Sequence, residues 1–310
     1  MVQYCFGADV GGTTVKLGLF NEAGIVIDKW EIPTRSKENK ILEDVAEAVL
    51  SKMEEKQITK EQVLGIGLGV PGPVSRDGVV NKAVNLGWND KVPVSQILSD
   101  LTGLKVEAGN DANVAALGEM WKGGGEGASN VVMFTLGTGV GGGIIINGSI
   151  VTGYHGAGGE VGHLHVEDDE KDCCGCGNQG CLEQYASATG VVRVAKKILV
   201  SCDTPSVLRK DDLTAKDVFD AVKAGDEVAK QVATQFGKYL GGAIANVCAV
   251  VDPEVIVIGG GVSKAGEVLL DYIKEGFQAH VFHGCAGVQF ALATLGNDAG
   301  IYGGAKLVLE

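Results

Sequence analysis

The chain has 310 residues, of which 45% are hydrophobic and 21% are charged, and its formal net charge is -13. This length suits two domains, and the acidic balance argues against nucleic acid as a partner, because a phosphate backbone attracts basic surfaces. The start of the chain lacks the basic region of a signal peptide, and no apolar run approaches the ~20 residues of a membrane span. We therefore expect a cytoplasmic protein that binds neither nucleic acid nor membranes.

The first thirty residues alternate short apolar runs with turns. Strands are expected at residues 4–10, at residues 15–20 and from residue 25 to Trp30. The turns between them, at residues 11–14 and 21–24, are short enough for hairpins. The chain is therefore predicted to open with three antiparallel strands.

Helices and strands are then expected in alternation. Residues 40–56 carry apolar side chains at helical spacing. An apolar run at residues 63–70 predicts a buried strand that ends at Pro71, residues 106–110 predict another strand, and residues 112–122 a helix. Such alternation is typical of an α/β domain.

The pattern of strand, glycine turn and strand then occurs a second time. Residues 131–136 are apolar, residues 137–143 are rich in glycine, and residues 144–146 are apolar again, as around Asp9. Two similar halves that face each other across a cleft are the natural inference. Further helices are expected near residues 186–199, 215–224, 226–250 and 299–308, and a further strand at residues 255–258.

Three glycine turns follow apolar runs and could bind phosphate. Glycines let backbone N–H groups approach an anion, and threonine hydroxyls add donors. A carboxylate such as Asp9 would act on phosphate through Mg²⁺ and water. A single short glycine turn could equally be an ordinary hairpin turn, but the presence of several such turns in one chain weakens that interpretation. The residues concerned are Asp9, Gly11, Gly12, Thr13 and Thr14, then Gly137, Thr138 and Gly139, and finally Gly259, Gly260 and Gly261, which we expect near adenosine or pyrophosphate.

Asn110 and Asp111 lie where a predicted strand leads into a predicted helix. Both residue types are favoured at a helix N-cap, and from the local sequence alone this interpretation leads. A carboxylate at this point could also accept the proton of an attacking hydroxyl. The two roles are compatible, because ligands bind at the carboxyl ends of strands in α/β sheets.

A cysteine cluster predicts a metal site. One imidazole and three thiolates make a closed tetrahedral zinc site, here His163, Cys174, Cys176 and Cys181. Clustered cysteines in a chain without an export signal bind metal more often than they pair. His165 competes with His163, and Cys173 competes with Cys174, although the C-x-C-x4-C spacing favours Cys174.

Polar groups near this cluster predict a sugar-binding surface. Glu160, His163 and Glu183 supply fixed acceptors for hydroxyl groups. Asn85 offers an amide beside the apolar wall of Trp88. By itself, however, that last segment indicates only a surface loop with one anchoring tryptophan.

Together these motifs resemble those of the ROK family (repressors, open reading frames and kinases), and within it the bacterial ATP-dependent glucokinases. The resemblance covers nearly the whole chain. It is carried by Asp9–Thr13, Leu68–Pro73, Asn85–Trp88, Asn110–Asn113, Leu136–Gly142, Gly158–His163, the cysteine loop with Glu183, and Ile258–Val262.

The resemblance implies an actin-like ATPase (ribonuclease H-like) fold with two α/β domains flanking a hinged cleft. The small domain would comprise residues 1–112 and 299–310, and the large domain, with the zinc loop, residues 113–298. Asp111 would be the catalytic base. The sugar would be bound by Asn85, Asn110, Asp111, Glu160, His163 and Glu183, and His163 would also bind structural Zn²⁺.

The implied reaction is transfer of the ATP γ-phosphoryl group to the 6-hydroxyl of glucose, with Mg²⁺ and a domain closure that excludes water. A homodimer or homotetramer is expected. A kinase for mannose, fructose or N-acetylmannosamine would use the same frame. A sugar-sensing repressor of the same family would need an N-terminal helix-turn-helix, for which the position of Asp9 leaves no room.

Overall fold

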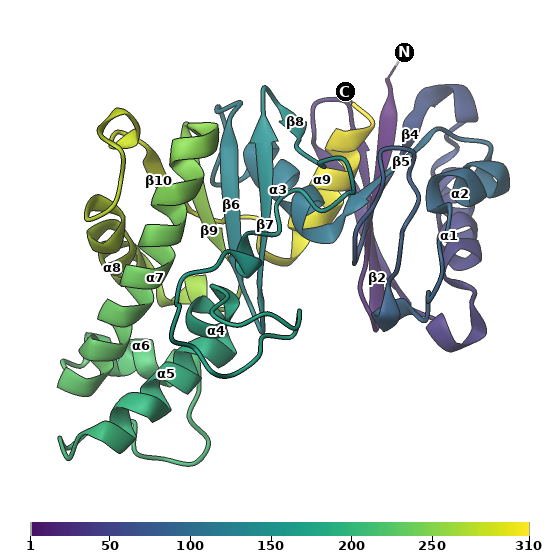
Figure 1. The fold of residues 1–310 in the computed structure, drawn as a ribbon. Helices are drawn as coiled ribbons and strands as arrows, with labels where there is room; N and C mark the ends of the chain where they lie inside the picture. Colours follow the sequence, from purple (N-terminus) through teal and green to yellow (C-terminus); the bar gives the residue numbers. More distant parts are fainter. Residues whose placement is uncertain (1, 310) are drawn as a thin grey trace. The chain divides into compact units, whose positions relative to one another are not determined.

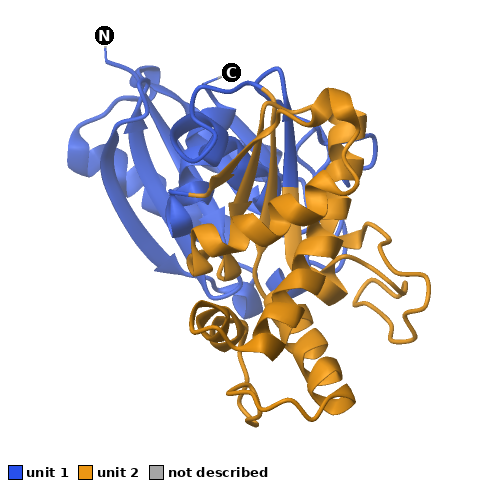
Figure 2. Ribbon diagram, turned by 90° about the vertical axis from the view of Figure 1, so that its left-hand side faces the viewer, with its two compact units in different colours: residues 1–129, 143–159, 294–310 blue, residues 130–142, 160–293 orange. Residues whose placement is uncertain are grey.

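The computed structural model describes residues 2–309 as a mixed α/β fold with two five-stranded sheets (Figure 1). The chain divides into two compact units, coloured separately in Figure 2. Unit 1 consists of residues 1–129, 143–159 and 294–310, and unit 2 of residues 130–142 and 160–293. The predicted α/β class is confirmed.

The sheet of unit 1 has the strand order β3-β2-β1-β4-β5. Its strands are β1 (Tyr4–Val10), β2 (Thr14–Asn21), β3 (Val26–Pro33), β4 (Val63–Val70) and β5 (Val106–Asn110). β1, β2 and β3 pair antiparallel, which confirms the predicted opening, whereas β4 and β5 run parallel to β1. The carboxyl ends of β1, β4 and β5 therefore share one edge of the sheet, and Asp9 and Asn110 lie at that edge.

Helices cover both faces of this sheet because side chains alternate along each strand. Phe6 and Ala8 of β1 belong to a core with α1 (Ile41–Lys56) and α2 (Val94–Thr102). Cys5, which precedes Phe6 and so points to the other face, belongs to a separate cluster that includes Ile301 of α9 (Ala299–Leu307). The helix predicted at residues 40–56 is confirmed.

α9 approaches its neighbours closely because it carries glycines. A Cβ atom on Gly303 would lie 1.7 Å from the carbonyl oxygen of Val114 in α3 (Asp111–Lys122), and one on Gly304 would lie 2.6 Å from the carbonyl oxygen of Gly67. α9 therefore lies against both α3 and the sheet.

This packing also accounts for a boundary that differs from the expected one. We expected the small domain to end at residue 112, yet α3 belongs to unit 1 together with residues 143–159. α3 contacts α9 through the glycines, and the Asn113 side-chain amide donates a hydrogen bond to the carbonyl of Gly158 at 3.0 Å. These contacts join segments that are far apart in the sequence.

The second sheet has the order β10-β9-β6-β7-β8. Its strands are β6 (Val131–Leu136), β7 (Val140–Ile146), β8 (Ser149–Ile150), β9 (Val255–Gly259) and β10 (Gln289–Leu292). β7 begins at Val140 rather than at residue 144, so the glycine turn contains only residues 137–139. Glycines 141–143 are part of this strand, and at Gly143 a close neighbour leaves no room for a side chain: a Cβ there would lie 2.5 Å from that of Ala116.

The helices of unit 2 are α4 (Glu183–Ala186), α5 (Ala188–Ser201), α6 (Ala215–Lys223), α7 (Glu227–Val251) and α8 (Glu267–Gln278). α5, α6 and α7 confirm three predicted helices within a few residues, whereas α4 and α8 were not predicted. Short 3-10 turns lie at Ser36–Glu38, Lys60–Gln62, Val84–Leu86, Val161–His163, Val262–Ala265, His283–Cys285 and Gly296–Asp298. Within residues 2–309, no helix combines the length and the apolar content that a membrane crossing requires.

Replacing either of two adjacent glycines of α7 by alanine should change stability, in opposite directions at the two positions. A Cβ on Gly241 would lie 2.3 Å from the backbone nitrogen of Phe277 in α8, whereas a Cβ on Gly242 would meet nothing closer than His280, at 3.5 Å. Gly241→Ala should therefore destabilise by about 1–3 kcal/mol through overpacking. Gly242→Ala should stabilise by about 0.5–1 kcal/mol, because alanine is the better helix former.

Thermal unfolding of the two variants beside the unsubstituted protein checks this pair. Each variant serves as the control for the other, since both introduce the same methyl group into the same helix. A Gly241→Ala protein that melts at or above the temperature of the unsubstituted protein would contradict the close packing of α7 on α8.

Candidate active site

Asn110 and Asp111 lie at the junction of β5 and α3. The Asn110 side-chain oxygen accepts hydrogen bonds from the backbone N–H groups of Ala112 and Asn113, at 3.0 and 3.2 Å, and its amide donates to the carbonyl of Gly72 at 3.2 Å. The predicted N-cap is therefore confirmed, and it is Asn110 that caps the helix. Asp111 is the first residue of α3, and its carboxylate accepts a hydrogen bond from Ala112 N–H at 2.8 Å.

Burial makes Asp111 a better proton acceptor than an ordinary aspartate. Burial raises the pKa of the Asp111 carboxyl group, against the lowering effect of hydrogen bonds from the backbone N–H groups of Ala112 and Asp111 and from Asn110. A carboxylate with a raised pKa holds an abstracted proton more firmly, which suits a general base.

Asp9 lies at the end of β1, close to the first turn of α9. A Cβ atom on Gly300 would lie 2.5 Å from the Asp9 carboxyl carbon. Burial, and then the nearby charge of Asp111, raise the pKa of Asp9 to about 6, although Lys16 opposes them. Unit 1 therefore holds two electrostatically coupled carboxyl groups at one edge of its sheet.

The raised pKa of Asp9 predicts a pH-dependent cost to stability. Its folded-state pKa of about 6 lies above the ordinary aspartate value of 3.8, so the folded protein binds the proton more tightly and the free energy of unfolding falls as pH rises from about 4 to about 6. Asp9→Asn removes this ionisation. At pH 7.5 the variant should be more stable than the unsubstituted protein by up to about 3 kcal/mol.

Denaturant unfolding of both proteins at pH 4.5 and pH 7.5 measures this effect. The stability difference should be small at the lower pH and largest at the higher pH. A difference of the same size at both pH values would show that the Asp9 carboxylate carries no burial cost.

The first glycine turn joins β1 to β2, as predicted. Gly11 N–H donates to the Thr14 carbonyl at 3.0 Å, while Gly12 and Thr13 are exposed at the tip. A Cβ on Gly12 would lie 3.9 Å from the carbonyl oxygen of Asn85, so the Asn85 segment lies beside this turn. Asn85 itself is exposed, whereas Trp88 is buried, which confirms the anchoring role of that tryptophan.

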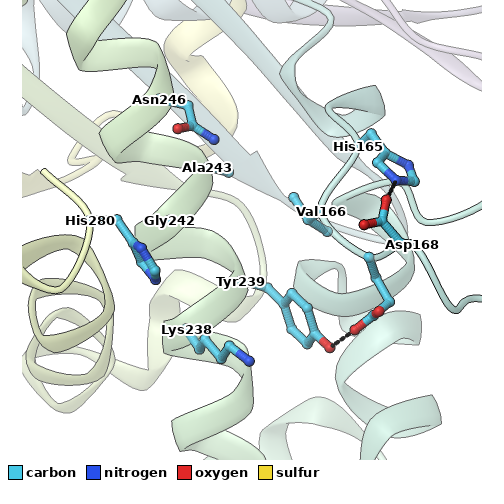
Figure 3. A pocket seen from close by; sticks show the side chains of 10 residues that line it. His165, Val166, Asp168, Lys238, Tyr239, Gly242, Ala243, Asn246 and His280 are labelled. Carbon is cyan, nitrogen blue, oxygen red and sulfur yellow. Dashed lines mark hydrogen bonds and ion pairs between the residues drawn. The ribbon is translucent and has the colours of Figure 1, made fainter.

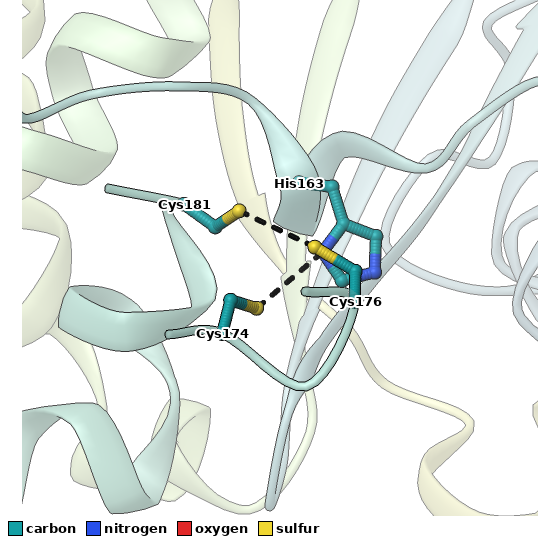
Figure 4. A group of neighbouring side chains, drawn as sticks. All are labelled: His163, Cys174, Cys176 and Cys181. Carbon is teal, nitrogen blue, oxygen red and sulfur yellow. Dashed lines mark hydrogen bonds between the residues drawn. The ribbon is translucent and has the colours of Figure 1, made fainter. Parts of the chain in front are cut away.

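The four predicted metal ligands in unit 2 form one group (Figure 4). The ligand atoms of His163, Cys174, Cys176 and Cys181 all lie within 4.8 Å of one another. The sulfurs of Cys176 and Cys181 are 3.7 Å apart, and Cys174 Sγ lies 3.8 Å from His163 Nδ1. Two thiolates on a tetrahedral zinc, at ~2.3 Å each, stand about 3.8 Å apart, whereas a disulfide would need ~2.05 Å. The residues therefore fit zinc and do not fit a disulfide.

The two alternative ligands lie outside this group. His165 is engaged on both ring nitrogens, since Nε2 lies 2.8 Å from an Asp168 carboxylate oxygen and Nδ1 lies 3.1 Å from the Gln179 carbonyl oxygen (Figure 3). Cys173 is exposed and is not part of the group. The structure thus groups His163 and Cys174 with the other two cysteines; the chain spacing favoured Cys174, whereas it left the choice between the two histidines open.

The candidate sugar ligands of unit 2 surround the cysteine group. His163 Nε2, on the ring side away from the cysteines, lies 4.0 Å from a Glu160 carboxylate oxygen. One oxygen of Glu183 lies 3.6 Å from Cys174 Sγ, and the other accepts a hydrogen bond from Val140 N–H at 3.0 Å. The metal group and two carboxylates therefore form one polar surface.

The second glycine turn lies beside that surface. A Cβ on Gly139 would lie 2.2 Å from a Glu183 carboxylate oxygen, so a side chain there would displace that carboxylate. The Gly137 carbonyl accepts a hydrogen bond from Ala188 N–H at 2.8 Å, and the Thr138 carbonyl accepts one from the Thr189 hydroxyl at 2.9 Å. The turn is thereby tied to the start of α5.

The third glycine turn borders a hollow of about 290 Å³ that the sequence did not reveal. Gly260 has a φ of +84° and packs against the backbone of Leu136, which requires glycine. The hollow is lined by Gly261 and Val262, by Ala188, by Thr214 to Lys216 with Phe219 and Asp220, and by Lys264 and Ala265. Ala188 therefore contacts both this hollow and the second glycine turn. Sequence patterns missed the α6 wall because its side chains resemble those of any amphipathic helix.

Known proteins share this architecture along nearly the entire chain. A glucokinase of Halalkalibacterium halodurans is 47% identical over 316 residues, which cover 99% of this chain and 96% of that protein. The crystal structure of a ROK hexokinase from Thermus thermophilus matches with a TM-score of 0.82 and 32% identity, covering 98% of this chain and 97% of that one. A ROK family glucokinase from Streptomyces griseus, solved in complex with glucose and AMPPNP, matches with a TM-score of 0.74 and 33% identity over 99% of both chains.

The likeness to these structures confirms the expected actin-like ATPase fold. The ROK family matches residues 5–310. The chain belongs to the ROK family.

Proposed function

We propose that this protein is an ATP-dependent glucokinase, which transfers the γ-phosphoryl group of ATP to the 6-hydroxyl of glucose. The observation that carries the proposal is the half-buried Asp111 carboxylate with its raised pKa, at the start of α3, where the backbone N–H of Ala112 holds it. The similarity to glucokinases, one of them solved with glucose and AMPPNP, supports the choice of substrates.

In the proposed reaction Asp111 accepts the proton of the 6-hydroxyl while that oxygen attacks the γ-phosphorus. A bond forms between the hydroxyl oxygen and phosphorus, and the bond from phosphorus to the β,γ-bridging oxygen breaks, so that ADP leaves. Proton transfer to a carboxylate in this position is the usual role of an aspartate in phosphoryl transfer to an alcohol. The backbone N–H groups at the start of α3 keep the carboxylate in place.

Polar side chains would hold the sugar. Asn85 and Asn110 would offer amides, and Glu160, His163 and Glu183 would offer further acceptors and donors. Glu183 is suited to this because a backbone N–H fixes one of its oxygens. His163 is suited because its Nε2 faces away from the cysteines. That nitrogen lies 4.0 Å from a Glu160 carboxylate oxygen, which favours this orientation of the ring.

The nucleotide would be held by the glycine turns. Gly137, Thr138 and Gly139 would bind phosphate oxygens through backbone N–H groups and a hydroxyl, as would Gly11 to Thr14. The hollow next to Gly259, Gly260 and Gly261 would take the adenosine, since Phe219 and Val262 give it apolar walls. Asp9 would hold Mg²⁺ through water, and the ion would neutralise charge on the phosphates.

Zn²⁺ would have a structural part only. Four protein ligands leave no open position for a substrate. Bound to His163, Cys174, Cys176 and Cys181, the ion would stabilise the loop between His163 and Glu183. The remaining expectations, a homodimer or homotetramer and a cytoplasmic location, belong to the same proposal, and light scattering after size exclusion measures the first.

A coupled ADP-release assay over a panel of sugars and phosphate donors tests the function. We expect the highest kcat/KM with glucose and ATP. A higher value with mannose, fructose or N-acetylmannosamine would keep the kinase and replace its substrate, and a higher rate with polyphosphate would replace its donor. Sugar binding without turnover on any sugar would instead indicate a regulator.

A further inference from the structure

The loop between His163 and α4 carries a second attachment besides the metal group. Residues 164–182 form turns and isolated bridges rather than a helix or strand. The metal ligands hold the start of this loop and its last third. The middle of the loop, residues 167–172, consists of charged residues, which are usually exposed to solvent.

Glu170, within this run, is buried instead. Its side chain is 2% exposed. One oxygen accepts a hydrogen bond from the Tyr185 hydroxyl at 2.6 Å and forms an ion pair with Arg193 of α5. The other accepts hydrogen bonds from the backbone N–H groups of Lys171 and Asp172, both at 3.0 Å.

A second carboxylate of the same segment is bound in a similar way. The Tyr239 hydroxyl of α7 donates to a Glu167 oxygen at 2.7 Å, a bond drawn as a dashed line from Tyr239 in Figure 3. The rings of Tyr185 and Tyr239 lie 4.1 Å apart between their centroids. The loop segment is thus docked against α4 and α7 through two tyrosine–carboxylate pairs, and against α5 through the Arg193 ion pair.

Such burial of a carboxylate is tolerated only when charge and hydrogen bonds compensate it. Glu170 meets this condition. Burial by itself would raise the pKa of Glu170. Hydrogen bonds and charges outweigh burial and lower this pKa to about 2; the hydrogen bonds come from Tyr185 and Asp172 N–H, and the charges are those of Arg193 and Lys197. The carboxylate is therefore charged throughout the neutral pH range, and its ion pair does not depend on pH there.

Tyr185 connects this attachment to the candidate sugar site. It lies two residues after Glu183 in the single turn of α4. We infer that Glu170 is a positioning residue, which holds α4, and with it the Glu183 carboxylate, in place against the metal group. The consequence for catalysis rests on the proposed function, in which Glu183 binds the sugar, whereas the consequence for metal retention does not.

Glu170→Gln tests the inference, because it keeps an acceptor for Tyr185 but leaves the half-buried Arg193 with only the exposed Asp172 as a charged partner. We expect the KM for the sugar to rise about tenfold, as for the loss of an outer partner of a binding group. The KM for ATP and kcat should change less than about twofold. A general loss of folding would move all three, because the second and third glycine turns lie in the same unit as Glu170. Zinc release to a chelator, followed by absorbance, should accelerate about tenfold.

Asp172→Asn is the matched control. Asp172 contacts the same Arg193 and Lys197, at 3.2 and 3.9 Å, but its side chain is 66% exposed. We expect less than a twofold effect on sugar KM and zinc release, since exposed ion pairs contribute little. Tyr185→Phe, which removes one hydroxyl group, provides a milder second variant should Glu170→Gln fail to fold.

The outcomes separate the two proposals. A folded Glu170→Gln protein with an unchanged sugar KM and an unchanged zinc-release rate would overturn the positioning role, whatever the reaction. If the unsubstituted protein phosphorylates no sugar, the proposed function fails. Zinc release from Glu170→Gln and Asp172→Asn would then still decide whether Glu170 holds the loop.

Discussion

Replacing Asp111 by asparagine should lower kcat by about 10²–10⁴, the usual contribution of a general base. Asparagine keeps the shape of the side chain and its hydrogen bond from Ala112 N–H, so α3 and the Asn110 cap should persist. The dissociation constant of the sugar, measured by calorimetry, should change by no more than a few-fold. The variant thus separates proton transfer from binding.

Glu43→Gln is the control for Asp111→Asn. Glu43 is also an acid in the first turn of a helix, α1, but it is exposed and belongs to no candidate site. Its substitution should leave kcat unchanged. Near-normal turnover in Asp111→Asn would remove Asp111 from its proposed role.

The pH profile of the unsubstituted enzyme carries the same information. Asp111 must be ionised to accept a proton, so kcat/KM should fall as pH drops through its pKa. Because burial raises that pKa, the fall should begin at a higher pH than for an ordinary aspartate, and Asp111→Asn should abolish this acid limb.

Loss of the metal is the second large effect that we expect. Cys176→Ser, or removal of zinc with a chelator, should raise the KM for the sugar by about 10- to 100-fold. The reason is that residues 164–182 lack regular secondary structure and depend on the metal group and the Glu170 attachment. Limited proteolysis should cut within this loop, and the melting temperature should fall.

Cys173→Ser is the matched control for Cys176→Ser. Cys173 lies three residues away, is exposed, and is outside the metal group. Its variant should keep one zinc per chain and the original sugar KM. A metal-free sample with unchanged sugar affinity and melting temperature would refute the structural role of zinc.

Much of the candidate site could be predicted from the sequence because its determinants are local. The N-cap at Asn110 and the glycine turn at residues 11–14 depend on a few consecutive residues. The choice of Cys174 over Cys173 likewise follows from spacing within one loop. Patterns of this kind are decided by covalent neighbours, and a single chain displays them directly.

Other features depended on contacts between distant segments. α3 belongs to unit 1 because Gly303 allows close backbone contact with Val114, a residue that lies far earlier in the sequence. The hollow beside Gly261 exists because α6 packs next to the end of β9.

The sequence alone therefore determined the α/β class, the glycine turns, the helix cap and the cysteines of the candidate metal group, since each is encoded by residue types at short, regular spacing. Only the tertiary structure decided which segments share a compact unit, where the hollow lies, and that Glu170 is buried while its neighbours in the same acidic run are not. The physical reason is that burial and pKa depend on the faces that helices and strands present to one another, and that arrangement is set by packing over the whole chain.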